Sequence, residues 1–281
     1  MTYQGNSRSK TVRQKPVTLD KLTLPRQYQR WDYQDYAHLW TLLSSTEKES
    51  WRSDASRRGI TPYNAFMRDR LLNLTNLMAR WHLDEAQGSI AFDSSKKGND
   101  GTYFGTSPLK GAIDNGRFLD GNDDYFTVPS HPSLNPTTAI AFDFFLLPYS
   151  FAHRQAIYDK RMPLQYWAFI EAGGPWMLFA FRSAGVDKDI YSPALQAGVL
   201  YHIAYSFNGL TQIASVFYNG NQVAQQNLGV STIDTGAGTL LLGNATPVAN
   251  RWLHGLLDHF SIYDVAIPQS LVQLHAERRY P

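Results

Sequence analysis

Acidic side chains are the residues of this chain whose spacing could support catalysis. Retaining cleavage of a glycosidic bond needs two carboxylates about 5–5.5 Å apart, one acting as nucleophile and one as acid/base. On a strand, such a pair would lie two or four residues apart on one face. Asp187 and Asp189 have that spacing, but we interpret their Gly-Val-Asp-Lys-Asp stretch as a turn. Glu171 stands alone and Asp143 is flanked by phenylalanines, so the sequence predicts no enzyme.

Aromatic side chains near turns are the second group that could do chemistry, by contact with a sugar. A sugar ring packs on an aromatic face beside polar donors and acceptors. Trp167, Trp176 and Tyr191 lie near the turns in the middle of the chain, and Gly173-Gly174-Pro175 is one of those turns. Because Trp176 leads the apolar run 177–181, we expect it in the core, with glycan contact as the alternative for all three.

Composition limits the chemistry further. The chain has 281 residues, 14% of them aromatic, and contains no cysteine, which excludes disulfides and thiolate metal sites. The eight histidines show no i, i+3 or i, i+4 metal-binding spacing. No segment reaches the roughly 20 apolar residues that cross a bilayer, so we expect no membrane partner.

Residues 1–31 are predicted to form a basic extended arm that precedes the folded part. The net charge of the chain is +2, yet its positive residues are concentrated here, against Asp20 alone. The two interpretations are a disordered tail and an arm that orders on a partner. We favour the arm because aromatic residues follow directly, and we assign the anchoring role to Arg8, Lys10, Arg13, Lys15, Lys21, Arg26, Arg30 and Trp31.

Residues 32–75 are predicted to form a small unit of three helices. Apolar residues at 36, 39, 40 and 43 give the first helix one apolar stripe. Ser44-Ser-Thr-Glu47 is a capping box that starts the second helix, and Gly59 ends it. Thr61 followed by Pro62 supplies the start of the third helix.

The segment 39–55 is similar to the middle of an HMG box, where a tryptophan-bearing helix meets a Leu-Ser-x-x-Glu-Lys helix start. That resemblance implies nucleic-acid binding. The match is partial, because Gly59 and Pro62 interrupt the place where the box continues its long helix. Similar small helical units occur in phage and prophage structural proteins, and a packing unit without nucleic-acid contact is the interpretation we favour.

Residues 76–281 show strand-like alternation and turn signals throughout. Residues 140–147 alternate so that one face, or both faces, of a strand would be buried. Asn208-Gly209 and Asn219-Gly220 each separate two alternating runs, which is the strongest short-range hairpin signal. Residues 268–276 fit a short closing helix. The overall pattern favours a β-sandwich.

Four motifs in this part of the chain together carry a family resemblance. They are Trp81–Glu85, Ala91–Gly101, Gly116–Pro129 and Gly255–Val265. In this order they resemble a laminin-G-like jelly roll of the concanavalin A-like lectin/glucanase superfamily. The resemblance implies a mainly β fold, a jelly-roll sandwich preceded by the arm and the three-helix unit.

The resemblance also implies a structural Ca²⁺ in some members, held by carboxylates of the first and last strands and a loop carbonyl. Asp258 would be the last-strand ligand, Asp84 or Glu85 the first-strand ligand, and Gly121 the carbonyl. The alternative is that Asp258 caps a turn or pairs with a basic neighbour. No other cofactor is expected.

We expect a non-enzymatic virion structural protein, either a capsid decoration or a tail-associated protein. Residues 1–75 would anchor it on capsid or tail proteins, and the sandwich would face outwards in several copies, with a cell-surface glycan as a second partner. The first residues lack the apolar core of a secretory signal, which favours synthesis in a host cytoplasm and release within a virus particle. The alternatives are a free carbohydrate-binding lectin or adhesin, and a nucleic-acid binder that uses the HMG-like segment.

Overall fold

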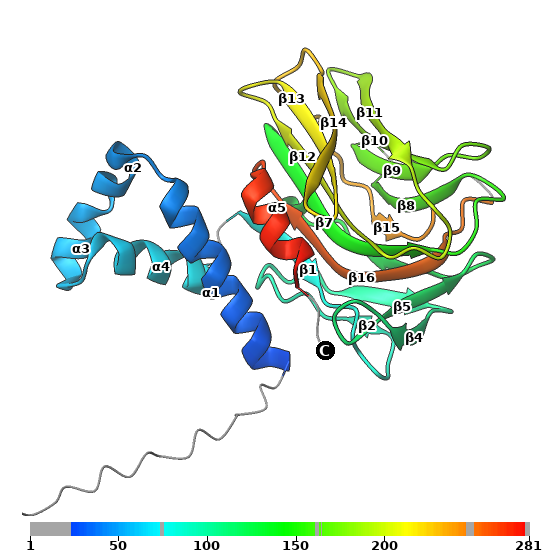
Figure 1. Ribbon diagram of the computed structural model, residues 1–281, viewed down its shortest axis with the longest axis horizontal. Coiled ribbons are helices and arrows are strands. Elements are labelled where there is room, and N and C mark those ends of the chain that lie inside the picture. The colour runs from blue at the N-terminus through cyan, green and yellow to red at the C-terminus, as the bar shows by residue number, and fades with distance from the viewer. Residues whose placement is uncertain (1–23, 74–75, 161–162, 164, 246–249, 279–281) are drawn as a thin grey trace, which may run out of the picture.

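The computed structural model describes residues 24–73, 76–160, 163, 165–245 and 250–278. Its largest part is a β-sandwich, with a group of helices packed at one side and a short helix, α5, lying against the sandwich (Figure 1). Within the described residues, sixteen strands form two eight-stranded sheets, and all strand pairs are antiparallel. The mainly β sandwich predicted from the sequence is confirmed.

The first sheet, sheet A, has the order β14-β13-β12-β7-β16-β5-β4. The long strand β16 is shared, because its first half pairs with β5 and its second half with β1. The strands of this sheet are β1 (Leu77–Trp81), β4 (Ser107–Lys110), β5 (Asn115–Asp120), β7 (Ala139–Pro148), β12 (Tyr201–Asn208), β13 (Ile213–Tyr218), β14 (Asn221–Asn227) and β16 (His254–Tyr263).

The second sheet, sheet B, has the order β11-β10-β9-β8-β15-β6-β3-β2. Its strands are β2 (Ile90–Ala91), β3 (Gly101–Phe104), β6 (Tyr125–Val128), β8 (Gln155–Lys160), β9 (Tyr166–Ile170), β10 (Trp176–Ser183), β11 (Val186–Ala194) and β15 (Leu240–Leu242). A single 3₁₀ turn, η1 (Pro132–Leu134), precedes β7.

The main core lies between the two sheets. Phe142 and Phe144 of β7 point into it, and Phe260 of β16 stacks on Phe144 with 4.9 Å between ring centroids. The alternate residues of β7, including Asp143 and Phe145, lie on the outer face of sheet A and are also buried. Both faces of this strand are therefore covered, as one of the two sequence interpretations predicted.

The hairpin between β13 and β14 shows how local sequence sets the strand register. Tyr218 pairs with Asn221, which leaves Asn219 and Gly220 as a two-residue turn. Both have positive φ, 49° and 82°, which asparagine and glycine tolerate best and which matches the twist of the flanking strands. The predicted hairpin is confirmed here.

The helical unit, which we define as residues 24–73, contains α1 (Leu24–Leu42), α2 (Ser45–Ser50), α3 (Arg52–Arg58) and α4 (Pro62–Asn73). The capping box at Ser44 is formed, and Gly59 ends α3 with a left-handed φ of 65°. The sequence predicted three helices, but the chain kinks at Trp51 and divides the second into α2 and α3. Phe66 is the centre of the unit, since Trp40 and Trp51 both pack on its ring.

Two sequence predictions about this region are wrong in detail. Helix α1 begins at Leu24, so residues 24–31 are helical and do not belong to an extended arm. The HMG-like segment does not form that fold, because α2 and α3 have six and seven residues and a separate helix follows Gly59. Nothing in the fold supports the resemblance to an HMG box.

The helical unit packs on the outer face of sheet A together with α5 (Gln269–Ala276). One apolar cluster joins Tyr36 and Phe66 of the unit to Tyr263 of β16 and Leu271 of α5. A second cluster places Trp31 of α1 against residues of the sandwich, namely Ala112, Ile113 and Phe145. The helices and the sandwich therefore share one buried interface.

We expect Phe260→Ala to lower the free energy of unfolding by about 3–5 kcal/mol, because the side chain is fully buried and its removal leaves a cavity. Urea-induced unfolding measures this loss. Phe92→Ala is the matched control, since Phe92 is 60% exposed, and it should change stability by less than about 0.5 kcal/mol. Equal effects of the two substitutions would contradict the described core.

Candidate binding site

Two aromatic side chains are exposed on neighbouring strands of sheet B. Trp176, the first residue of β10, is 40% exposed, and Tyr191 of β11 is 49% exposed. Tyr191 pairs across the strands with Leu178, and a bulge lies between Trp176 and Leu178. The expectation that Trp176 is buried in the core is wrong, because it lies at the strand end, ahead of the register shift.

A glycine turn supports the ring of Trp176. The backbone N–H of Glu171 donates to the carbonyl of Trp176, and the N–H of Trp176 donates to Gly174, which closes the turn between β9 and β10. A Cβ added to Gly174 would lie 1.6 Å from the Trp176 ring, so the ring rests directly on this glycine. The turn thereby sets the direction in which the indole is presented.

Charged side chains flank the two aromatic residues. Arg154 forms an ion pair with Glu171 at 2.7 Å, and its guanidinium lies over the Phe169 ring, 4.3 Å from the centroid. Partial burial, together with the nearby carboxylates of Asp189 and Glu171, raises the pKa of Tyr191. We call this group the sheet-B aromatic surface and define it as Trp176, Tyr191, Arg154, Glu171 and Asp189.

Trp167, the third aromatic residue predicted to contact a glycan, is buried. It lies in the middle of β9 between Asp159 of β8 and Ala180 of β10, and only 5% of it is exposed. Its ring belongs to a small apolar cluster with Phe169 and Leu178. Trp167 is therefore not available to a ligand.

A cavity of about 800 Å³ lies where α1 meets the sandwich. Several of its polar lining groups are engaged within the chain: the Tyr28 hydroxyl donates to Asp84 at 2.8 Å, and Asp32 pairs with Arg80 at 2.5 Å. Tyr28 also stacks on the His82 ring at a centroid distance of 3.6 Å. This cavity could not be anticipated from the sequence, because it depends on how α1 docks.

The four residues proposed to bind Ca²⁺ do not form one site. Gly121 lies against His254, which is four residues, or about 13 Å, from Asp258 along β16. Glu85 accepts hydrogen bonds from the Tyr103 hydroxyl and the Phe92 backbone.

One carboxylate oxygen of Asp258 is already occupied by backbone hydrogen bonds. Its Oδ2 accepts the backbone N–H groups of Ala112 and Ile113 at 2.8 and 2.9 Å. Burial, with the charge of Asp84 adding to it, raises the pKa of Asp258 to about 8. The residues do not fit the predicted Ca²⁺ site, and the alternative that Asp258 caps a turn agrees with the two N–H bonds.

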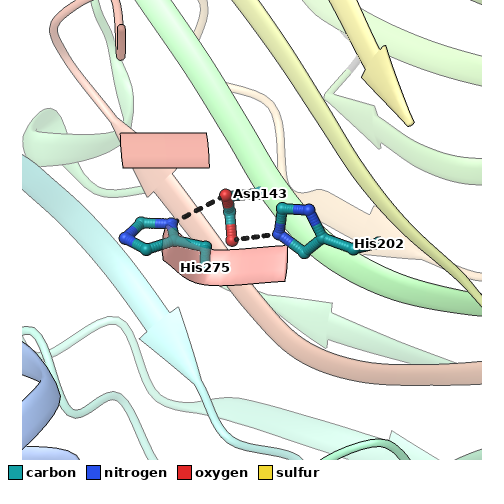
Figure 2. Close-up of side chains that lie close together, drawn as sticks. All are labelled: Asp143, His202 and His275. Carbon is teal, nitrogen blue, oxygen red and sulfur yellow. Dashed lines mark hydrogen bonds and ion pairs between the residues drawn. The ribbon is translucent and has the colours of Figure 1, made fainter. Parts of the chain in front are cut away.

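The most concentrated group of buried ionisable side chains lies between sheet A and the helices. Asp143 of β7 contacts His275 of α5 through Oδ2 and His202 of β12 through Oδ1, at 2.8 and 3.2 Å (Figure 2). His275 also faces Asp35 of α1 at 3.3 Å, and Asp35 pairs with Arg278. Burial alone would raise the pKa of Asp143, but the two imidazoles hold it well below the usual range.

The sequence did not reveal this group because its members are far apart in the chain and lack metal-ligand spacing. A second acidic group, Asp120, Asp123 and Asp124, lies in the turn after β5. Its carboxylates accept hydrogen bonds from the turn itself, including the N–H groups of Asp120 and Asn122. This second group is therefore explained by the turn.

The predicted anchoring residues have different positions. Arg8, Lys10, Arg13, Lys15 and Lys21 lie outside the described residues. Arg26 is within α1, Arg30 is exposed on the same helix, and Trp31 is buried against the sandwich. Trp31 therefore contacts this chain itself, and its assignment to an arm that anchors on a partner is wrong.

We expect Asp258→Asn to change the pH dependence of stability. The folded chain keeps a proton on Asp258 that the unfolded chain loses between about pH 4 and pH 8, so wild-type stability falls as pH rises through this window. The asparagine accepts the same two N–H bonds and does not ionise. Its stability relative to wild type should rise by up to about 1.4 kcal/mol per pH unit, measured by denaturant unfolding. Parallel pH profiles would contradict this interpretation.

Solved structures with a similar fold include binding domains. The binding domain of Paraclostridial Mosquitocidal Protein 1 matches with a TM-score of 0.59 and 15% identity, over 72% of this chain and 52% of that one. The receptor-binding domain of botulinum neurotoxin D matches with a TM-score of 0.58 and 10% identity, over 72% and 52%. This chain thus spans about half the length of these two structures.

A third solved structure is matched almost completely. It is domain 4 of AbnA, a GH43 extracellular arabinanase from Geobacillus stearothermophilus, in complex with arabinotriose. The TM-score is 0.58 at 18% identity, over 72% of this chain and 98% of that one. At these identities, the three likenesses establish the fold alone.

No curated protein sequence matches the chain. None of the described helices has the length and apolar composition needed to cross a bilayer. A laminin-G family model, described as the concanavalin A-like lectin/glucanases superfamily, matches residues 120–273, which is more than half of the chain. The chain therefore belongs to the concanavalin A-like lectin/glucanases superfamily.

Proposed function

We propose that the sandwich is a non-catalytic carbohydrate-binding module and that the sheet-B aromatic surface contacts the sugar. The observation that carries the proposal is the joint exposure of Trp176 and Tyr191 beside the Arg154–Glu171 ion pair. Aromatic faces take the apolar side of a sugar ring, while charged and amide groups at the edge bind its hydroxyls. The glycine turn under Trp176 supplies a preorganised ring position, which lowers the cost of binding.

The similar solved structures support a binding role. One of them was determined with arabinotriose, and two others are described as binding or receptor-binding domains. Sugar or receptor binding is a property of those similar proteins. Their relevance to this chain is that the same sandwich supports non-catalytic recognition.

The positions of the acidic residues support a role without catalysis. Asp187 and Asp189 lie in β11 rather than in a turn, which corrects the sequence interpretation, and they are two residues apart on an edge strand. Asp187 pairs with Arg182 at 2.6 Å, and both aspartates are exposed. A catalytic acid needs a raised pKa, which burial in a cleft normally supplies. Asp187 and Asp189 are exposed, so neither carboxyl has the burial that a catalytic acid normally requires.

The second part of the proposal is the setting: display on a virus particle, as a capsid decoration or tail-associated protein in several copies. The basic residues between 1 and 23 support it, because they could bind an acidic surface of an assembled shell. The helical unit is an unsuitable detachable anchor, since it is packed on sheet A. A free lectin or adhesin remains the alternative. A nucleic-acid-binding role is no longer supported, because it rested on the HMG-box resemblance, which the fold does not bear out.

We expect Trp176→Ala and Tyr191→Ala each to weaken glycan binding at least tenfold, which corresponds to about 1.4 kcal/mol. The full chain is screened on a glycan array and titrated with arabinotriose and the strongest array ligand. Phe92→Ala is the exposed aromatic control and should bind normally.

Two outcomes would contradict the carbohydrate-binding part of this proposal. Absence of binding to every glycan would contradict a carbohydrate-binding role. Loss of binding in Tyr33→Ala, with normal binding in Trp176→Ala, would move the site to the cavity beside α1, which Tyr33 lines.

Display on a virus particle is tested separately. Mass spectrometry of purified particles should detect the chain, and deletion of residues 1–23 should abolish salt-sensitive attachment. Particles without the chain would contradict the virion proposal.

A further inference from the structure

We propose that Asp143, His202 and His275 bind a divalent transition-metal ion, with Zn²⁺ as the ion that best suits these donors. The three side chains come from β7, β12 and α5, and Figure 2 shows the carboxylate of Asp143 between the two imidazoles. This inference does not depend on the carbohydrate-binding role, because the sheet-B aromatic surface is on the other sheet.

The geometry brings three donor atoms to one point in space. One donor atom from each of Asp143, His202 and His275 lies within 4.8 Å of the other two. Ligand atoms around a tetrahedral ion with bonds of about 2.0–2.1 Å are about 3.3 Å apart, close to the observed contacts of 2.8 and 3.2 Å. Asp143 and the two imidazoles would therefore fill three of the four coordination positions.

Unsatisfied polar atoms point to a ligand at the same place. His202 is fully buried: within the described part of the chain its Nδ1 has no hydrogen-bond partner, and its Nε2 contacts Asp143 Oδ1 at 3.2 Å without hydrogen-bond geometry. A buried polar group without a partner costs about 1–3 kcal/mol. Coordination of His202 Nε2 to a metal would remove that cost at one of the two nitrogens.

A second carboxylate lies beside His275, within ion-pair distance but without hydrogen-bond geometry. The Nδ1 of His275 faces Asp143, while its Nε2 lies 3.3 Å from Oδ2 of Asp35 on α1. Metal-bound histidines commonly donate the other ring N–H to a carboxylate, which fixes the ring orientation and the tautomer. Asp35 is itself held by Arg278, so this support does not depend on solvent.

The donor set and burial determine the class of ion. Two imidazoles and one carboxylate suit Zn²⁺ and similar transition metals, whereas Ca²⁺ and Mg²⁺ prefer oxygen ligands. All three residues are at most 3% exposed, which favours a structural ion over a catalytic one. Such an ion would tie α5 to the centre of sheet A.

The test begins with the full chain stripped of metal by a chelator and incubated with ZnCl₂ or CoCl₂. We expect one equivalent of Zn²⁺ to remain bound after desalting, measured by elemental analysis. The melting temperature should rise by about 5–10 °C at a hundredfold excess over the dissociation constant. Bound Co²⁺ should give the visible absorption of a tetrahedral site. Folded chain that retains no metal would overturn the proposal.

Matched variants locate the ion. His202→Gln and His275→Gln should each lose the bound equivalent, with folding verified by circular dichroism. His131→Gln, at an exposed histidine, should keep it. Should both cluster variants unfold, the cobalt spectrum of the wild-type chain still decides, because nitrogen and oxygen ligands give bands that aqueous Co²⁺ lacks. Retention of one equivalent by folded His202→Gln would overturn the assignment.

Discussion

The buried contact between Asp35, His275 and Asp143 is the constraint on which the arrangement of this chain depends. It joins the first helix, the last helix and the central strand of sheet A, at side chains that are almost completely removed from solvent. Removing one partner of a buried ionic pair costs about 3–5 kcal/mol, because the other charge stays buried without compensation. The helices and the sheet must therefore be held together for these groups to be satisfied.

The covering of sheet A determines which surfaces remain for recognition. The helical unit and α5 lie on its outer face, so both faces of β7 and β12 are buried. Sheet B has no helix packed on its outer face in the described part of the chain, and it presents Trp176 and Tyr191. The same packing also creates the cavity at α1, since Tyr28 and Asp32 of that helix form one wall.

Much of the fold could be predicted from local sequence. The capping box at Ser44, the left-handed glycine at 59 and the Asn219-Gly220 turn each specify a backbone conformation within a few residues, and all three are confirmed. The family motifs predicted the sandwich for a similar reason, because turn residues and strand alternation are local signals. The first part of α1 was missed because residues 24–31 are mostly polar and include Pro25, so they show no apolar helical period.

The sites could be predicted less well, because they are made by residues distant in sequence. Exposure of Trp176 depends on a bulge and a glycine turn, and burial of Trp167 depends on its place in the middle of β9. His202 and His275 meet only because α5 returns to sheet A after the last strand. Asp258 was predicted as a Ca²⁺ ligand or a turn cap, but its partners, the backbone N–H groups at 112 and 113, could not be predicted.

Native-state hydrogen exchange of α1 tests most directly the claim that the helical unit and the sandwich form one cooperative body. Amides in the hydrogen-bonded part of α1 should exchange with the same free energy of opening as those of β7 and β16, because undocking α1 alone would leave His275 and Arg278 without the Asp35 carboxylate. Exchange of α1 with an opening free energy several kcal/mol lower, while the sheet stays protected, would contradict this account.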